Sequence, residues 1–174
     1  MGFRPVPPDR AIDWTLFFDA PGARTAQRAL RIDGRMPRAL IALPEDITGH
    51  LDDPRDASLA ARDLQRGLST GLPSGEDAAR ALGLEPLAPD EVGLPGWAGA
   101  TPLWFYVGRE AEILGDGDRL GPLGGRLVAG VLVALLDRDP GSFRSLDPAW
   151  TPVLPAAAGD PGRFTLLDLL LAGR

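Results

Sequence analysis

The sequence lacks cysteine and lysine and has a single histidine. Without cysteine, the 174-residue chain can have no disulfide framework, no thiol nucleophile and no thiolate metal site. This composition fits a reducing compartment, so we expect a cytoplasmic protein. All 18 basic residues are arginines, and 24 acidic residues bring the net charge to −6. Because this charge repels a phosphate backbone, we expect no nucleic-acid partner.

Long hydrophobic runs are also missing. The most apolar segment, LVAGVLVALL at 127–136, is bounded by Arg126 and Asp137. It is shorter than the roughly 20 residues that span a bilayer. The N-terminal residues do not form the apolar core of a secretory signal. We therefore expect no membrane span, and we expect residues 127–136 to form a buried helix.

Apolar residues make up 44% of the chain, which is enough for a core, and few segments alternate as strands do. We predict an all-α fold with little or no β-structure, in a single partial domain over 1–174. Residues 11–20 and 24–43 are interpreted as helical pieces. Residues 44–58 and 85–100 are rich in turn-forming residues, so they are interpreted as internal loops.

Five further helices are predicted from apolar periodicity and from residues that start or end helices. They span about 59–68, 76–82, 101–115, 122–136 and 166–171. Ser74 with Asp77 has the form of a capping box. Thr101 is expected to cap its helix, with Pro102 in the first turn. The expected buried faces of the two long helices are Leu103, Val107, Ala111 and Leu114, and Leu123, Leu127, Val131 and Leu135.

Two motifs could carry chemistry by residue type. His50 has no serine at nucleophile-elbow spacing and no second metal ligand nearby, so we interpret it as a solvated loop residue. The segment 116–118, Asp-Gly-Asp, has the form of the start of a calcium loop. Leu120 and Pro122 stand where later ligands are needed, which disfavours calcium. We therefore predict no metal site.

Glycines and aromatic residues are interpreted structurally. Gly121, Gly124 and Gly125 follow no predicted strand, so close helix packing explains them better than a dinucleotide fingerprint. The aromatic run at 104–106, Trp-Phe-Tyr, is interpreted as part of the core rather than as a cofactor site.

Several blocks, in order, resemble a known family. The segment ARDLQRGLSTGLPSGEDAARALGL at 61–84 resembles the block L-N-x-x-R-G-x-x-x-G-L-P of the animal-type haem peroxidase superfamily, the relatives of myeloperoxidase and cyclooxygenase. TPLWFYVGREAEILGDGDRLGPLGGRLVAGVLVALLDRDPGSF at 101–143 resembles the next block of that family. The opening GFRPVPPDRAIDWTLFFDAPG and the closing FTLLDLLLAG are similar to its bacterial branch. The resemblance covers nearly the whole chain and implies the C-terminal helical portion of a haem-peroxidase-like domain.

The resemblance also implies a cofactor and two residues that contact its surroundings. In the family, an Asn on the first block's helix bonds the proximal histidine, and an Arg three residues later lies near a haem propionate. Asp63 and Arg66 stand at these positions here. By resemblance, both are candidate haem-binding residues that support an axial ligand outside this chain. The alternative is a surface Asp–Arg pair that contributes a few tenths of a kcal/mol.

The family's catalytic histidines are missing. Its proximal histidine and its distal histidine and arginine belong to motifs that precede the region this chain resembles, and His50 matches neither. Peroxide chemistry needs those groups for proton transfer and O–O cleavage. We therefore expect the isolated chain to be inactive, and we predict no catalytic residue in it. Met1 marks a short gene, a misassigned start or one half of a split protein.

Two functions follow from the resemblance. In the first, the chain is the proximal-side part of a hydrogen-peroxide-dependent oxidoreductase, with haem as cofactor and an N-terminal peroxidase half as partner. In the second, it is a non-catalytic helical protein-binding module derived from that scaffold, and the partner is another protein or a second copy. Either function predicts exposed apolar surface, with the helices containing Asp63 and Pro102 as the main contributors.

Overall fold

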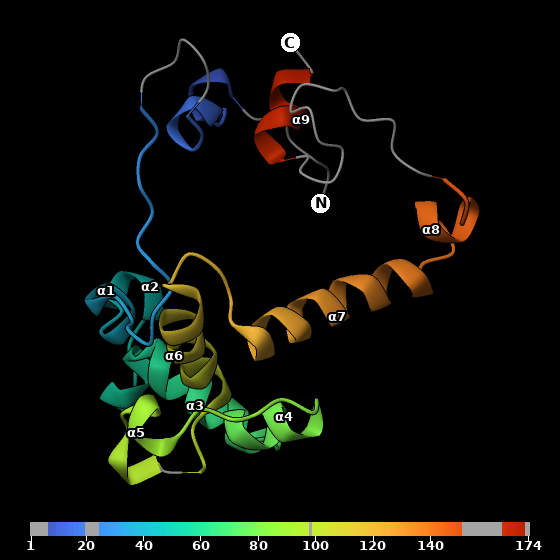
Figure 1. Ribbon diagram of the computed structural model, residues 1–174. Coiled ribbons are helices and arrows are strands. Elements are labelled where there is room, and N and C mark those ends of the chain that lie inside the picture. Colours follow the sequence, from blue (N-terminus) through green and yellow to red (C-terminus); the bar gives the residue numbers. More distant parts are fainter. Residues whose placement is uncertain (1–6, 20–24, 98, 151–164, 173–174) are drawn as a thin grey trace. The chain divides into compact units, whose positions relative to one another are not determined.

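The computed structural model describes residues 7–19, 25–97, 99–150 and 165–172 (Figure 1). These residues form helices and irregular segments, with no strand among them, so the all-α prediction is confirmed. The chain divides into two compact units: Met1–Leu30 with Leu146–Arg174, and Arg31–Ser145. Each unit is described by itself, and the single partial domain expected over 1–174 stays a prediction.

The larger unit contains most of the helices. Their bounds are α1 Arg38–Ile41, α2 Glu45–Thr48, α3 Leu59–Ser69, α4 Gly75–Ala81, α5 Pro89–Val92, α6 Leu103–Gly115 and α7 Pro122–Arg138, with the 3₁₀ turns η3 Pro54–Ala57 and η4 Pro95–Trp97. The short helix α8, Phe143–Leu146, lies at the boundary between the units. Within the described part of the chain, no helix is long and apolar enough to cross a membrane.

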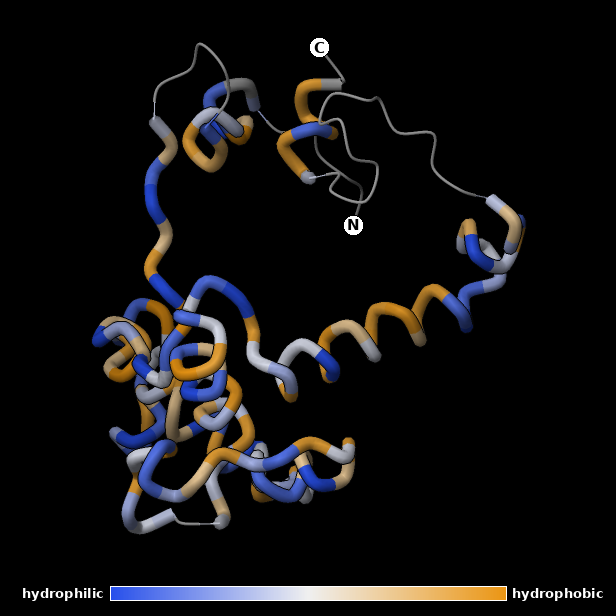
Figure 2. Tube along the Cα trace, in the orientation of Figure 1, coloured by the Kyte–Doolittle hydropathy of each residue, from blue (hydrophilic) through white to orange (hydrophobic). Residues whose placement is uncertain are grey.

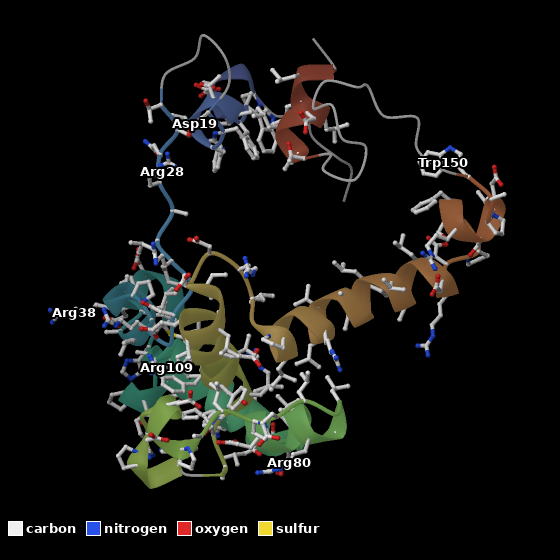
Figure 3. All side chains as sticks on the ribbon, viewed as in Figure 1. Asp19, Arg28, Arg38, Arg80, Arg109 and Trp150 are labelled. Atoms are coloured by element: carbon white, nitrogen blue, oxygen red, sulfur yellow. The ribbon has the colours of Figure 1, made fainter. Side chains whose placement is uncertain are left out.

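The smaller unit contains η1 Pro8–Arg10, η2 Trp14–Leu16 and α9 Leu166–Ala172. Asp19 bonds the backbone of the segment that follows, accepting from the Ala26 N–H at 2.8 Å and pairing with Arg28 at 3.3 Å (Figure 3). At the start of α9, the Thr165 hydroxyl and backbone N–H both donate to Asp168, and these bonds lower the pKa of that carboxyl. The predicted helix at 166–171 is confirmed with one residue added.

N-cap residues mark the starts of α3 and α4. α3 begins after Ser58, whose hydroxyl accepts from the Ala61 N–H, and α4 begins after Ser74, whose hydroxyl accepts from the Asp77 N–H at 3.1 Å. The predicted Ser74 cap is confirmed, although the Asp77 carboxylate pairs with Arg80 at 2.9 Å (Figure 3). These side-chain acceptors satisfy N–H groups that have no partner within the helix.

The helical prediction for 24–43 was wrong over most of its length. Among its described residues, only Arg38–Ile41 is helical. The preceding segment instead bonds the turn after α6: the Ile32 N–H donates to the Gly117 carbonyl at 2.8 Å, and Arg31 donates to the Asp116 carbonyl at 2.9 Å. These tertiary bonds outcompete a modest helix propensity. Residues 11–20 likewise form only the 3₁₀ turn η2 in their described part.

The two expected loops contain single helical turns. The segment 44–58 includes α2 and η3, and 85–100 includes α5 and η4, so neither is irregular throughout. Each turn begins at or just after a proline, namely Pro44, Pro54, Pro89 and Pro95. A proline ring fixes φ at a helical value, and its missing N–H costs nothing in a first turn.

The core lies where α4, α5 and the starts of α6 and α7 meet. Tyr106 and Leu123 are fully buried, packed with Ala78, Ala79, Leu87 and Val92. A side chain at Gly75 would collide with Tyr106, so glycine lets α4 approach α6 closely. The core interpretation is confirmed for Tyr106, while Trp104 and Phe105 beside it are only partly buried.

The expectation that residues 127–136 form a buried helix was wrong. The segment is helical, but only the first turns of α7 lie against α6, and the rest extends away from the other helices of its unit (Figure 1). Figure 2 shows apolar residues along this extended part. Val131 and Leu135, expected in the core, are 59% and 62% exposed. Leu114 near the end of α6, also expected on a buried face, is 51% exposed.

Candidate functional site

A buried carboxylate on α6 holds the start of α7. Glu110 is 2% exposed, and its two oxygens accept from the Leu123 N–H at 3.0 and 2.9 Å. One of them also accepts from the Gly124 N–H at 3.2 Å. The N-cap residue of α7, Gly121, has no side chain that could bond these groups. Glu110 therefore caps α7 from a neighbouring helix, with its negative charge at the positive end of the helix dipole.

Two glycines make this capping geometry possible. A Cβ atom at Gly121 would lie 2.5 Å from Oε2 of Glu110, and one at Gly124 would lie 2.7 Å from a methyl carbon of Val107. The close-packing interpretation is confirmed at these positions. It was wrong for Gly125, where a Cβ atom would meet nothing within 4 Å. The Glu110 carboxylate and Val107 thus fix the first turn of α7 against α6.

A second buried carboxylate joins α4 to the start of α6. Glu76, 3% exposed, accepts from the Thr101 N–H at 3.0 Å and from the Thr101 hydroxyl at 2.6 Å. Thr101 was expected to cap α6 with its hydroxyl. The N-cap is Pro102, and the Thr101 side chain instead bonds another helix. Because α6 begins at Leu103, Thr101 lies one residue before the N-cap position.

Tyr106 on α6 is a third buried polar residue of this region. Its hydroxyl oxygen accepts from the Leu87 N–H at 2.7 Å. Burial raises the pKa of this phenol above the usual 10.0, the Leu87 bond opposes the rise, and the charges of Glu110 and Glu76 add to it. Tyr106 is therefore neutral across the ordinary pH range. All three side chains are bonded to backbone N–H groups of the fold.

The exposed part of α7 carries a row of apolar side chains. Four residues at helical spacing form one stripe, which we call the valine–leucine face: Val128, Val131, Leu132 and Leu135. Their exposed fractions are 49%, 59%, 57% and 62%. Contiguous apolar surface of this kind marks sites of protein interaction. The sequence predicted exposed apolar surface, but on α3 and α6 rather than here.

The candidate haem-contacting residues lie on α3 and bond each other. Arg66 Nη1 is 3.4 Å from Asp63 Oδ1, with side chains 70% and 31% exposed. Their i, i+3 spacing places them on one helix face, as the sequence predicted. Both are accessible to a ligand or partner, and their pairing is also what the surface ion-pair interpretation expects.

The remaining candidates are structural or solvated. His50 is exposed between α2 and η3, as expected for a loop residue. Asp116 ends α6 with a left-handed φ of 52°, and its carbonyl accepts from Arg31, so the 116–118 segment is a helix-ending turn. Across the described ranges, no group of three or more His, Asp or Glu side chains could hold a metal ion.

Arg109 joins α6 to α5 and also pairs with a residue of its own helix. Its guanidinium donates to the Glu91 carbonyl at 2.7 Å and to the Glu112 carboxylate at 2.5 Å (Figure 3). Beside it, Trp104 packs edge-on against Phe105. The buried Trp104 indole N–H has no hydrogen-bond partner in the part of the chain that the structure describes.

The described residues do not form a haem site by themselves. Asp63 and Arg66 have suitable chemistry, an acceptor for an imidazole N–H and a cation for a propionate, but they lie on an open helix surface. The chain's one histidine, His50, is exposed and lies outside α3. No protein family model matches the chain, and no curated protein or solved structure matches it.

Proposed function

We propose that the chain is the C-terminal, proximal-side portion of a haem-dependent peroxidase-like domain and that it docks on an N-terminal portion through the valine–leucine face of α7. One observation carries the docking part: four large apolar side chains of a well-formed helix are about half exposed or more. The assignment to peroxidases rests on the resemblance of the ordered sequence blocks at 2–22, 61–84, 101–143 and 164–173.

The roles of this chain's residues follow from their positions. Glu110 fixes the first turn of α7, so the valine–leucine face is presented in one orientation relative to α6. On α3, Asp63 would accept from the N–H of a haem-ligating histidine supplied by the partner, and Arg66 would be the cation for a propionate. Haem supplies the peroxide chemistry when it is bound, and this chain supplies neither the axial ligand nor a distal acid–base pair.

Co-expression tests the docking. The chain is produced with an N-terminal peroxidase portion that carries the proximal histidine, and capture and the haem Soret band are measured. We expect the wild type to be captured. Val131→Asp should weaken capture at least about tenfold, because it buries an unpaired charge. Ala129→Asp is the control at an exposed position of α7 outside this face, and it should bind like the wild type. Equal capture of both variants, or no capture of any, would contradict the proposal.

Asp63 gives a test of the haem assignment in the assembled protein. A carboxylate accepts the imidazole N–H more strongly than an amide, which stabilises the ferric state and lowers the reduction potential. Asp63→Asn should therefore raise the potential, by about tens of millivolts if the bond resembles other charge-assisted ones. The reduction potential of Arg66→Ala is measured as well, because Arg66 pairs with the Asp63 carboxylate. An unchanged or lower potential with haem still bound would exclude Asp63 as the proximal partner.

A second candidate is the non-catalytic binding module. It is favoured by the use of the buried carboxylates: Glu76 and Glu110 each bond backbone N–H groups of neighbouring segments. This candidate predicts capture of a partner or self-association without stoichiometric haem. Haem content of the captured complex separates the two functions.

A further inference from the structure

A second face of α7 has a different character. Arg126, Gly130, Val133 and Asp137 follow one another at spacings of four, three and four residues, so they line one side of the helix. We call this side the charged-end face. It lies across the helix from the valine–leucine face, because residues 126 and 131 are about 140° apart at 100° per residue. Val133 is 43% exposed, and a Cβ atom at Gly130 would meet nothing within 4 Å.

The charged-end face is complementary to itself. If a second α7 lies antiparallel, with the two-fold axis between residues 131 and 132, Arg126 of each copy lies opposite Asp137 of the other. The same axis places Val133 of each copy over Gly130 of the other, a side chain facing a position that has none. Antiparallel helices also have opposed dipoles. Arg126 and Asp137 are about 16 Å apart along the axis at 1.5 Å per residue, so the two ion pairs close both ends of the apolar segment.

The charged groups at both ends are each bonded through one atom within the chain and keep further atoms for a second bond. Arg126 uses one guanidinium nitrogen to bond the Leu82 carbonyl at 2.7 Å, and the guanidinium has further donors. Asp137 accepts from Arg144 on one oxygen at 2.6 Å, and its side chain is 47% exposed. Leu82, 40% exposed beside Arg126, adds apolar surface at that end.

We propose that two copies of this chain associate through the charged-end face of α7, antiparallel, with reciprocal Arg126–Asp137 ion pairs and Val133 packed over Gly130. A dimer of this kind leaves the valine–leucine face available. It is therefore compatible with the proposed docking and does not depend on it.

Charge reversal tests the pairing in the full chain. The dimer dissociation constant is measured by analytical ultracentrifugation for the wild type, Arg126→Asp, Asp137→Arg and the double variant. Each single reversal should weaken the dimer at least about tenfold, because it turns two attractive pairs into repulsive ones. The double variant should restore the dissociation constant to within about threefold of the wild type. Arg138→Asp is the control, one residue from Asp137 but on another side of the helix, and it should leave the dimer intact.

An engineered disulfide gives a second measurement that does not need charge variants. The chain has no cysteine, so Val133→Cys and Gly130→Cys chains can be mixed and oxidised without background. A mixed disulfide that forms faster than either symmetric one supports the pairing. A monomeric wild type, a dimer indifferent to both single reversals, or no preference for the mixed disulfide would overturn it. A dimer lost on Val131→Asp but not on the reversals would also overturn it, because the other face would then carry the contact.

Discussion

The two ends of α7 differ in what surrounds them. At the start, Leu123 is fully buried and its N–H is bonded by Glu110. Two turns later, Val131 and Leu132 are more than half exposed although they are just as apolar. The helix continues because its own hydrogen bonds and helix-forming residues sustain it once it has been started. The comparison teaches that α7 has the apolar composition of a core helix, while the described residues bury only its first turns.

The largest effect should come from removing the residue that holds the packed end. Glu110→Ala leaves the Leu123 and Gly124 N–H groups buried without an acceptor, and it also opens a cavity. We expect the free energy of unfolding to fall by about 2–5 kcal/mol, measured by urea titration. Glu110→Gln keeps an oxygen acceptor and should lose much less. Equal losses in the two variants would mean that the charge, rather than the hydrogen bonds, holds α7.

A smaller loss is expected at Tyr106, which lies in the same packed region. Tyr106→Phe keeps the ring but removes the acceptor of the buried Leu87 N–H. The free energy of unfolding should fall by about 1–3 kcal/mol, the usual cost of an unsatisfied buried group. Phe105→Leu is a useful control, because it alters a partly buried neighbour without touching this bond. A neutral Tyr106→Phe would show that Leu87 finds another acceptor.

Alkaline pH should weaken the packed region through the same residue. The pKa of Tyr106 is raised by burial above the usual 10.0, so the folded state holds this proton more tightly than the unfolded state. The contribution is complete below about pH 10 and is lost as the pH rises through the folded pKa. Tyr106 is the only tyrosine and there is no lysine, so no other side chain titrates near this pH. Stability of the wild type should therefore fall above pH 10, and that of Tyr106→Phe should stay nearly flat; parallel curves would contradict the assignment.

Local chemistry predicted the helices better than it predicted their surroundings. Ser74, Pro122 and Gly115 mark helix ends through backbone geometry and capping, which depend on a few neighbouring residues. The helical prediction for 24–43 failed because this segment bonds the turn at 116–117, which is distant in sequence. The prediction that α7 is buried failed for a related reason. Periodicity shows which residues favour burial, but it does not show whether other segments of the chain pack against them.

The candidate site was harder to predict than the fold. Glu110 could have been noticed, since it lies among Val107, Ala111 and Leu114 on the predicted apolar face, where an unpaired carboxylate is costly. The partners of Glu110 on α7 could not have been predicted from the sequence, because they are backbone N–H groups of another helix. The Asp63–Arg66 pair followed from spacing alone, while any role toward haem depends on a polypeptide outside this chain.

Thiol labelling tests the contrast within α7 most directly. The chain has no cysteine, so Leu123→Cys and Leu132→Cys each report on one position. At concentrations where the chain is monomeric, we expect Leu132→Cys to react at nearly the rate of a free thiol. Leu123→Cys should react slower by a factor of about 100 or more, since its labelling needs an opening that costs several kcal/mol. Protection of Leu132→Cys in the monomer, at a rate close to that of Leu123→Cys, would show that the chain covers α7 itself and would contradict the account.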